Sequence, residues 1–276
     1  MSIRALPALR LLTGATLLLL AATPAFAQRR SSSGTWSRDC DRSGDRNTER
    51  FCMTTETTMP SPAGTLMVDG RRNGGISVYG SSRRDVLIRA RIQASARSEE
   101  RAEEIARAVR IRTAEGRVFA EGPETGSREW WSVNFEVDVP SRSDLDLKSN
   151  NGGIEVVEVR GVLRLETTNG GIHLEGLAGD VVAETSNGGV DVRLVGERWE
   201  GKGLEAITSN GGVRVRIPEG YSARLETGTT NGGIDIDFPV TVRGRIGRQV
   251  STELGQGGAT IRVMTTNGGV VIRRGE

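Results

Sequence analysis

The sequence predicts an all-β fold, a stacked-coil β-solenoid, from one repeated phrase and the alternating segments around it. Six copies of Asn-Gly-Gly followed by Ile or Val fill the second half of the 276-residue chain, each after two polar residues, and a seventh copy stands apart nearer the N-terminus. The asparagines are Asn73, Asn151, Asn169, Asn187, Asn210, Asn231 and Asn267. From Asn151 onward the intervals are 18, 18, 23, 21 and 36 residues. A period of this length predicts repeats that stack on their neighbours.

Two strands per coil are predicted by apolar residues at every second position on both sides of the phrase. The third and fifth residues after each Asn are apolar, as at Ile154 and Val156. The sixth residue before it is apolar, and the fourth is apolar in most copies, as at Leu145 and Leu147. This alternation marks a half-buried strand. Each coil of about 18–23 residues is therefore expected to contain two strands and two corners.

The Asn-Gly-Gly phrase is expected to form one corner of each coil. Glycine adopts a positive φ at little cost, and Asn tolerates the left-handed region better than most residues. Stacked asparagines can also bond to one another in a ladder, which would explain Asn at all seven positions. Asn-Gly between alternating runs is equally a hairpin signal, so a meander forming a sandwich or barrel is the rival architecture. One phrase per two strands favours the solenoid.

Residues 63–140 are predicted to form a β-rich N-terminal part with one short helix, and residues 141–276 the regular repeats. Strands are expected over 66–68, 76–79 and 86–92. Ser98 followed by two glutamates predicts a helix N-terminus, with the helix over 98–110 packed on the first coils. Apolar residues at a spacing of two from Trp131 to Val139 predict the strand that leads to the regular coils.

Residues 1–27 have the features of a secretory signal peptide: a basic start, an apolar stretch, and a small-x-small end at Ala25-Phe26-Ala27. No later segment is apolar enough to cross a membrane once this signal is removed. The signal contains two arginines and no acidic residue, so the mature chain would have 35 basic and 35 acidic residues. This balance excludes a global attraction to nucleic acid. We therefore expect an exported protein of the periplasm or the cell surface.

Residues 28–62 are predicted to be a polar lead-in that contains both cysteines of the chain, Cys40 and Cys52. In an exported chain a close pair of this kind predicts a disulfide, worth about 3 kcal/mol for so short a loop. A metal site is disfavoured because the only histidine, His173, is far away in the sequence.

No catalytic, cofactor-binding or metal-binding motif is found. The Gly-Gly pairs lack the Lys-Ser/Thr of a phosphate loop, and Ile or Val stands where a calcium-binding repeat needs Asp. The outward charges of successive coils, such as Asp191, Arg214 and Asp235, have mixed signs. Mixed signs favour a solvated ladder of ion pairs over the paired acids of a polysaccharide-cleaving enzyme.

Trp199 is the best candidate for a ligand contact. It lies in the insertion 196–203, which lengthens the third interval, and loops that leave a regular scaffold often carry function. The equal alternative is that Trp199 fills an irregular gap in the core.

The run Leu145–Glu276, with its repeated [Ser/Thr]-[Ser/Thr]-Asn-Gly-Gly-[Ile/Val], resembles the putative-adhesin β-solenoid family of bacterial envelope proteins. The order before it, an early Asn-Gly-Gly strand, an Ala/Glu/Arg helix and a Trp-Trp strand, is also similar, so the resemblance covers about residues 63–276. It implies no catalytic residues and no cofactor. The 23- and 36-residue intervals depart from the pattern and predict an insertion and a degenerate coil with its corner at Gln256-Gly257-Gly258.

Together these features predict an exported, non-enzymatic adhesin or envelope scaffold that binds a protein or glycan ligand through the faces of its sheets. The alternative is a periplasmic envelope-sensing or regulatory binding domain, and a remote alternative is a polysaccharide-cleaving β-helix enzyme. The open ends of a solenoid also offer unpaired strand edges, so self-association through the ends is a further expectation.

Overall fold

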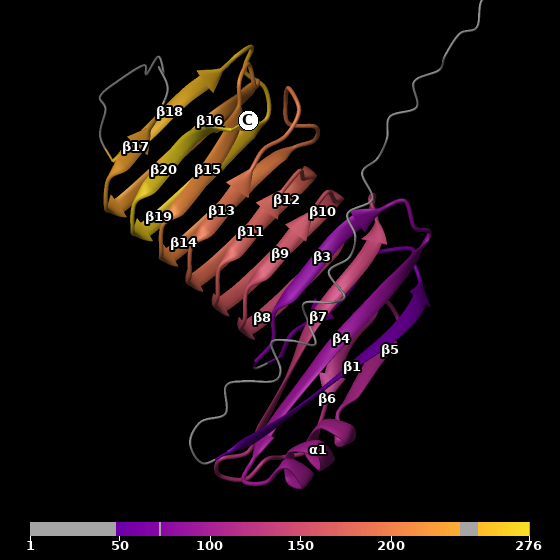
Figure 1. Cartoon of the computed structure of the whole chain (residues 1–276). Coiled ribbons are helices and arrows are strands. Elements are labelled where there is room, and N and C mark those ends of the chain that lie inside the picture. The colour runs from indigo at the N-terminus through magenta and orange to yellow at the C-terminus, as the bar shows by residue number, and fades with distance from the viewer. Residues whose placement is uncertain (1–47, 72, 238–247, 276) are drawn as a thin grey trace, which may run out of the picture.

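The computed structural model describes residues 48–275 except 72 and 238–247, and these residues form two ten-stranded sheets and one helix. The predicted all-β class with a short helix is therefore confirmed. The two sheets lie face to face and form a long stack with an extended N-terminal part (Figure 1).

Sheet A contains, in spatial order, β1 (Glu49–Pro60), β4 (Asp85–Ala96), β7 (Trp130–Pro140), β3 (Ile76–Ser81), β9 (Ile154–Val157), β11 (Ile172–Glu175), β13 (Val190–Arg193), β15 (Val213–Pro218), β20 (Val270–Gly275) and β17 (Ile234–Ile236). Sheet B contains β18 (Gln249–Leu254), β16 (Ala223–Asn231), β19 (Thr260–Asn267), β14 (Gly203–Asn210), β12 (Ala178–Asn187), β10 (Arg160–Asn169), β8 (Leu145–Asn151), β2 (Leu66–Asp69), β6 (Arg117–Glu121) and β5 (Arg110–Ala114).

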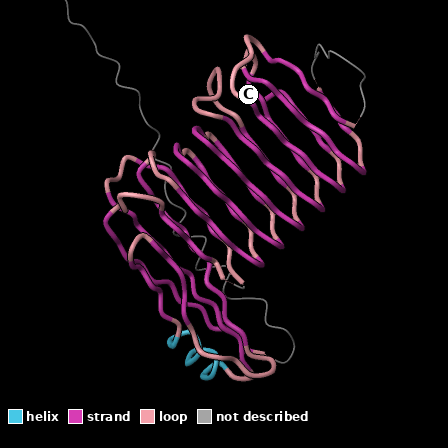
Figure 2. Tube along the Cα trace, turned by 180° about the vertical axis from the view of Figure 1, so that it is seen from behind, coloured by secondary structure: helices cyan, strands magenta, loops and turns pink. Residues whose placement is uncertain are grey.

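Each Asn-Gly-Gly phrase joins a strand of sheet B to the next strand of sheet A, and the coils formed in this way stack in parallel. In sheet B, for example, β8, β10, β12 and β14 are parallel neighbours with their asparagines in register. In sheet A, β9, β11, β13 and β15 pair in the same manner. Parallel pairing excludes the hairpin meander, and the regular stack is visible from behind in Figure 2.

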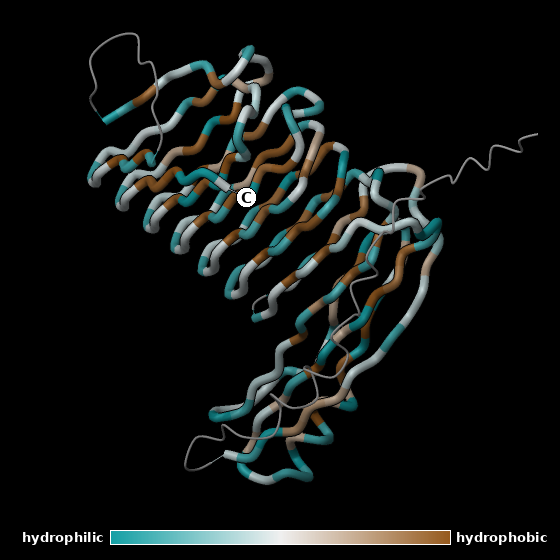
Figure 3. The backbone as a smooth tube through the Cα atoms, turned by 45° about the horizontal axis from the view of Figure 1, so that its top comes forward, coloured by the Kyte–Doolittle hydropathy of each residue, from teal (hydrophilic) through white to brown (hydrophobic). Residues whose placement is uncertain are grey.

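The core lies between the two sheets and is built from the apolar residues predicted to point inward. In the coil of β8 and β9, the side chains of Leu145, Leu147, Ile154 and Val156 are at most 1% exposed. The same alternation continues along the stack, where apolar and polar residues follow one another along each strand (Figure 3). Burial of this apolar area is the main stabilising contribution to the coils.

The helix α1 (Glu99–Ala108) begins as predicted. The Ser98 side chain accepts a hydrogen bond from the backbone N–H of Arg101 at 3.3 Å, and the buried residues of the helix are Ala102, Ile105 and Ala106. The expectation that it packs on the first coils is wrong, because α1 contacts β4 and β1 instead. These long antiparallel strands extend beyond the stack, so the helix that follows β4 cannot reach the coils.

Part of the predicted polar lead-in is a strand. The twelve residues of β1 pair with β4 over their whole length. Phe51, Met53 and Met59 pack against the core. They stand at odd-numbered positions, but the residues at positions 55 and 57 are threonines, so the apolar alternation is too weak to predict the strand. Cys52 lies in β1, whereas Cys40 and the whole of residues 1–27 lie outside the described residues. The disulfide and the signal peptide therefore stay predictions.

The stack begins earlier than the sequence suggested. The coil of Asn73, formed by β2 and β3, pairs directly with the coil of Asn151 through parallel contacts to β8 and β9. The intervening residues form β4, α1, β5, β6 and β7, which extend both sheets at this end.

The C-terminal coils are not stacked in chain order. The last coil, β19 and β20, lies between the coil of β14 and β15 and the coil of β16 and β17. The predicted degenerate coil is wrong, because Gln256–Gly258 form the turn between β18 and β19, and β18 pairs antiparallel with β16. The long interval thus contains a strand that reverses direction, which lets the chain return into the stack.

In the described part of the chain, no helix has both the length and the apolar character needed to span a bilayer.

Candidate functional site

The stacked corners are joined by a continuous ladder of asparagine side chains. From Asn151 onward, the Nδ2 of each asparagine donates to the Oδ1 of a neighbouring asparagine, at 2.8–3.0 Å. The spatial order is Asn73, Asn151, Asn169, Asn187, Asn210, Asn267 and Asn231. The predicted ladder is confirmed, and it follows the spatial rather than the sequence order of the coils.

A second ladder lies beneath the first. In each coil from Asn151 onward, the Ser or Thr two residues before the Asn donates its hydroxyl hydrogen to the carbonyl oxygen of a Gly in the neighbouring coil, at 2.7–2.8 Å. Thr208, for example, is completely buried and donates to the Gly188 carbonyl. Each buried hydroxyl of this ladder therefore has a partner, as a buried polar group requires.

The first glycine of each phrase is required by close approach of stacked backbones. A Cβ atom at Gly152, Gly170, Gly188 or Gly211 would lie less than 3.0 Å from a carbonyl oxygen of the adjacent coil. The expectation of left-handed corners is wrong, because none of the described asparagines has a positive φ, and Gly268 is the single phrase glycine that does. The corners are tight because coils touch, and not because their backbone is left-handed.

The second glycine of each phrase is less constrained. A Cβ atom would lie 3.1 Å from the nearest atom at Gly153, 3.4 Å at Gly212 and 3.6 Å at Gly269, and it would meet nothing within 4 Å at Gly233. Toward the C-terminal end of the stack, neither packing nor φ therefore excludes a side chain here.

These second glycines form the floor of a groove on the outer face of sheet A, which we call the glycine trough. Its volume is about 930 Å³. The floor glycines are Gly75, Gly153, Gly171, Gly189, Gly212 and Gly269. Because the coils are about 4.8 Å apart, this floor is about 24 Å long. The trough crosses the strands and links residues that are far apart in the sequence.

The wall of the trough is the row of residues two positions further along each strand, which share the outer face with the glycines. These are Ser77, Glu155, His173, Asp191, Arg214 and Val271. The N-terminal end of the trough is lined by Arg91 of β4 and Asn134 of β7. Asn134 accepts a hydrogen bond from the Gly75 backbone N–H at 2.8 Å, which positions its side chain at the end of the floor.

Ion pairs hold the charged groups of the wall. The Asp191 carboxylate lies 2.9 Å from Arg216 and 3.4 Å from Arg214, and it is 3.7 Å from His173. The predicted row of Asp191, Arg214 and Asp235 is interrupted, because Val271 of the inserted last coil lies between Arg214 and Asp235. The wall thus contains both acidic groups, Glu155 and Asp191, and a basic group, Arg214, among uncharged neighbours.

Tyr79 supports the wall from the neighbouring row. Its hydroxyl donates to Glu155 Oε2 at 2.9 Å, and burial together with this carboxylate raises the pKa of Tyr79 to about 12. The phenol therefore stays neutral and keeps donating at any physiological pH.

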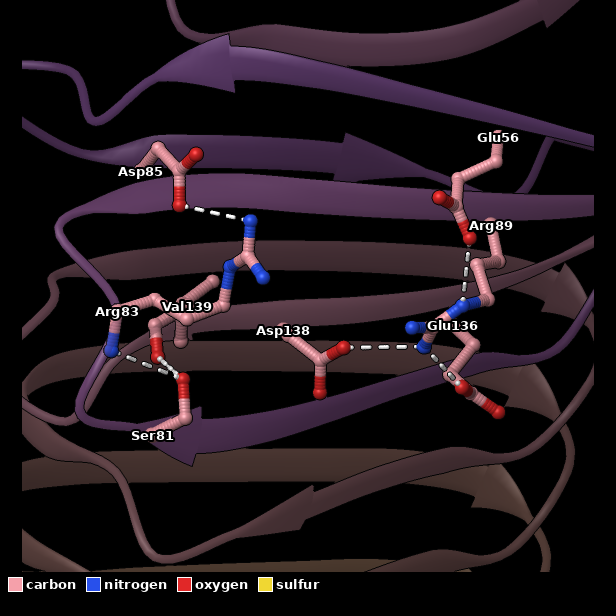
Figure 4. Close-up of polar contacts among 8 residues, drawn as sticks. All are labelled: Glu56, Ser81, Arg83, Asp85, Arg89, Glu136, Asp138 and Val139. Atoms are coloured by element: carbon pink, nitrogen blue, oxygen red, sulfur yellow. Dashed lines mark hydrogen bonds and ion pairs between the residues drawn. The ribbon is translucent and has the colours of Figure 1, made fainter. Parts of the chain in front are cut away.

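The same outward row continues into the N-terminal part of sheet A. There Arg89 contacts Glu136 at 2.7 Å, Asp138 at 3.0 Å and Glu56 at 3.0 Å (Figure 4). Nearby, Arg83 pairs with Asp85 at 2.8 Å. The three carboxylates around Arg89 come from β1 and β7, so this guanidinium joins three strands of the sheet.

Trp199 does not lie on an exposed loop surface. Its side chain is 6% exposed and packs in the core, and its indole N–H donates to the Gly179 carbonyl at 3.0 Å. The candidate ligand contact is therefore not supported by this conformation, and the alternative of filling a gap in the core is the one that fits. Its aromatic area covers the irregular corner that the insertion creates.

The histidine of the wall lies beside two carboxylates. His173 Nε2 lies 3.6 Å from Glu175, and its Nδ1 lies 3.7 Å from Asp191. Within the described residues, no group of three His, Cys, Asp or Glu side chains could hold a metal ion. What the arrangement offers is a series of hydrogen-bonding groups beside an unobstructed floor.

Comparisons with known proteins identify the family of this fold. No curated protein sequence matches the chain significantly. Among solved structures, a putative cell adhesion protein from Clostridium sporogenes aligns at 10% identity and a TM-score of 0.42, covering 81% of this chain and 100% of its own. A putative adhesin from Bacteroides fragilis aligns at 10% identity and a TM-score of 0.37, covering 81% and 97%. A putative lipid binding protein from Parabacteroides distasonis aligns at 10% identity and a TM-score of 0.36, covering 83% and 98%.

A protein-family model also matches the chain. The model of the Toastrack DUF4097 family matches residues 134–273, slightly more than half of the chain, from within β7 to within β20. The chain therefore belongs to the Toastrack DUF4097 family.

Proposed function

We propose that the protein is an exported, non-enzymatic binding protein of the cell envelope, an adhesin or scaffold that holds its ligand on the outer face of sheet A. The observation that carries this proposal is the glycine trough, a floor without side chains about 24 Å long beside a row of polar groups. A long, shallow groove of this form suits an extended ligand better than a compact small molecule.

The contacts of the wall support binding rather than catalysis. General acid–base chemistry on a glycan needs two carboxyl groups kept in different protonation states on either side of the scissile bond. The wall carboxylates are instead engaged with neighbours: Asp191 with two arginines, and Glu155 with the Tyr79 hydroxyl. These contacts fix the positions of the two carboxylates on the outer face of sheet A.

Protease treatment of intact cells, followed by immunoblotting, tests the location. With the signal peptide predicted at residues 1–27, the protein should be found outside the cytoplasm. Digestion in intact cells that leaves a periplasmic marker intact would favour the adhesin. Protection until the outer barrier is opened would favour a periplasmic scaffold or sensing domain, and a cytoplasmic location would refute the proposal.

Cosedimentation tests the binding. The processed protein, purified from cells, should sediment with isolated envelopes in a saturable manner, and unlabelled protein should displace it. Soluble protein at every envelope concentration would contradict a binding role.

A further inference from the structure

We infer that the ligand of the glycine trough is a straight, uncharged polysaccharide chain lying across the strands, with one sugar ring above each coil. This inference rests on the proposed function and names the chemical class of the ligand. It depends on four observations: the floor has no side chains, its carbonyls are already paired, its wall contains both acidic and basic groups, and its coils are spaced like the rings of a sugar chain.

The floor is free of side chains where packing permits them. At Gly212 and Gly269 an added Cβ would make only ordinary contacts of 3.4 and 3.6 Å, and neither residue has a left-handed φ. The first glycines of the same phrases are different, because backbone contact excludes any side chain there. At these two coils, packing and φ leave room for a side chain, and its absence keeps the floor open to a ligand.

The backbone carbonyls of the floor are already used in the stack. The floor carbonyls already accept from the next strand: Gly171 from Ile154 at 3.0 Å, Gly189 from Ile172 at 2.9 Å, and Gly212 from Val190 at 3.0 Å. Peptides that bind sheets add a strand at an edge, where backbone groups are unpaired. A ligand in the trough therefore lies across the middle of a sheet and not along its edge, and the side chains of the wall are polar partners within its reach.

The wall suits hydroxyl groups and not charges. Glu155 and Asp191 would repel a polyanion such as nucleic acid, and Arg214 with Arg91 would repel a polycation. Sugar hydroxyls both donate and accept, so they can bond to carboxylate, imidazole and guanidinium groups in turn. The carboxylates of the wall retain further acceptor sites beside the contacts that hold them, since each has about four lone-pair positions.

The spacing of the wall matches a sugar chain. Wall residues of successive coils are about 4.8 Å apart, whereas an extended peptide advances about 3.3 Å per residue. Pyranose rings in a straight β-1,4-linked chain advance by nearly the spacing of one coil, so one ring can lie above each coil, with successive rings turning opposite edges to the wall. Six floor glycines therefore correspond to about six rings.

Isothermal titration of the processed protein with cello-oligosaccharides and chito-oligosaccharides of two to eight rings tests the inference. Affinity should rise at least tenfold between three and six rings for one of the two series, and then stay constant. Dextran, which is not straight, and an uncharged extended peptide should bind at least tenfold more weakly. No binding of either series, or equal binding of dextran or the peptide, would overturn the inference.

Matched glycine variants test the place of binding. The double variant Gly212→Ala with Gly269→Ala puts two methyl groups on the floor and should weaken hexasaccharide binding at least tenfold. Gly233→Ala is the control, since it has the same place in the phrase but lies outside the trough, in open space. Its affinity should equal that of the wild type.

A wall variant covers the case in which the double variant fails to fold. His173→Ala removes a wall group that is partly exposed and should weaken binding at least threefold, with an unchanged thermal midpoint. Unaltered affinity in folded variants of both kinds would overturn the inference. Saturable envelope cosedimentation without oligosaccharide binding would refute the sugar ligand alone and leave the proposed function standing.

Discussion

The two corners of each coil are built on opposite principles. At the Asn-Gly-Gly corner, every coil repeats the same contacts: an amide to an amide, a hydroxyl to a glycine carbonyl, and a glycine backbone against a glycine backbone. At the opposite corner the contacts differ from coil to coil. There Trp199 fills the third interval, Arg160 pairs with Glu200, and Asp144 accepts from the Val162 backbone N–H.

This difference shows which residues must be the same in every coil of a stacked repeat. A ladder needs the same residue at the same height in every coil, because each residue is both donor and acceptor for its neighbours. The opposite corner satisfies its groups locally, and it can therefore accept an insertion such as residues 196–203. The Asn-Gly-Gly corners set the register of the coils, and the opposite corners accommodate differences in coil length.

The largest effect is expected at the irregular corner. Trp199→Ala should lower the free energy of unfolding by about 3–5 kcal/mol, because a large buried side chain leaves a cavity. Urea unfolding followed by circular dichroism measures it. Trp199→Phe should cost less than half as much. A loss below about 1 kcal/mol for the alanine variant would show that this corner tolerates any change.

The regular corner should respond next most strongly to a methyl group. Gly188→Ala places a Cβ against the Gly170 carbonyl and should cost about 2–3 kcal/mol through backbone strain. Gly233→Ala, with nothing within 4 Å, should cost much less. Equal midpoints for the two variants in urea would contradict the close-approach explanation.

Removal of one buried hydroxyl should have an intermediate effect. Thr208→Val keeps the shape but leaves the Gly188 carbonyl without this donor, at a cost of about 1–2 kcal/mol. Thermal unfolding measures the change. Thr208→Ser retains the hydroxyl, as Ser149 does naturally, and should recover part of the loss; a serine variant no more stable than the valine variant would argue against the hydrogen bond.

One break in the asparagine ladder should cost less, because its amides are exposed to water. Asn187→Ala removes the bonds to Asn169 and Asn210 and should cost about 1 kcal/mol. Amide hydrogen exchange should show faster opening in both adjacent coils. Faster exchange confined to residue 187 would mean that the ladder does not couple the coils.

The smallest effect is expected from the ion pair at the irregular corner. Arg160 and Glu200 are 55% and 63% exposed, so a double-mutant cycle with alanine should give a coupling of about 0.5 kcal/mol or less. A coupling above about 1 kcal/mol would show that the irregular corner depends on charge as well as on Trp199.

The parts of the fold that follow from local pattern could be predicted, and the parts that depend on distant pairing could not. The strands and the asparagine ladder are encoded in each phrase. The place of the last coil is not, because Asn231 and Asn267 have the same phrase around them. The strand at Glu49–Pro60 depends on its pairing with β4, which its own weak alternation does not reveal.

The candidate site was missed for a related reason. In the sequence the second glycine looks like an ordinary turn residue, and its role appears only when successive coils are placed in register. Arg91 and Asn134, at the end of the trough, come from strands outside the repeats, and no sequence signal connects them with the glycines. The wall residues were noticed as charges, but the repeat alone did not show that they border a groove.

The position of the last coil has a consequence for biosynthesis. A chain made from its N-terminus presents β16 and β17 before β19 and β20, and the phrase at Asn231 could pair with Asn210 as well as the phrase at Asn267 does. Growth of the stack one coil at a time on the ribosome would thus fill the wrong position, and the misplaced coil would have to detach before the C-terminus could enter. A chain that reaches its compartment unfolded avoids this trap, since both competing coils arrive together and the more stable order can be selected.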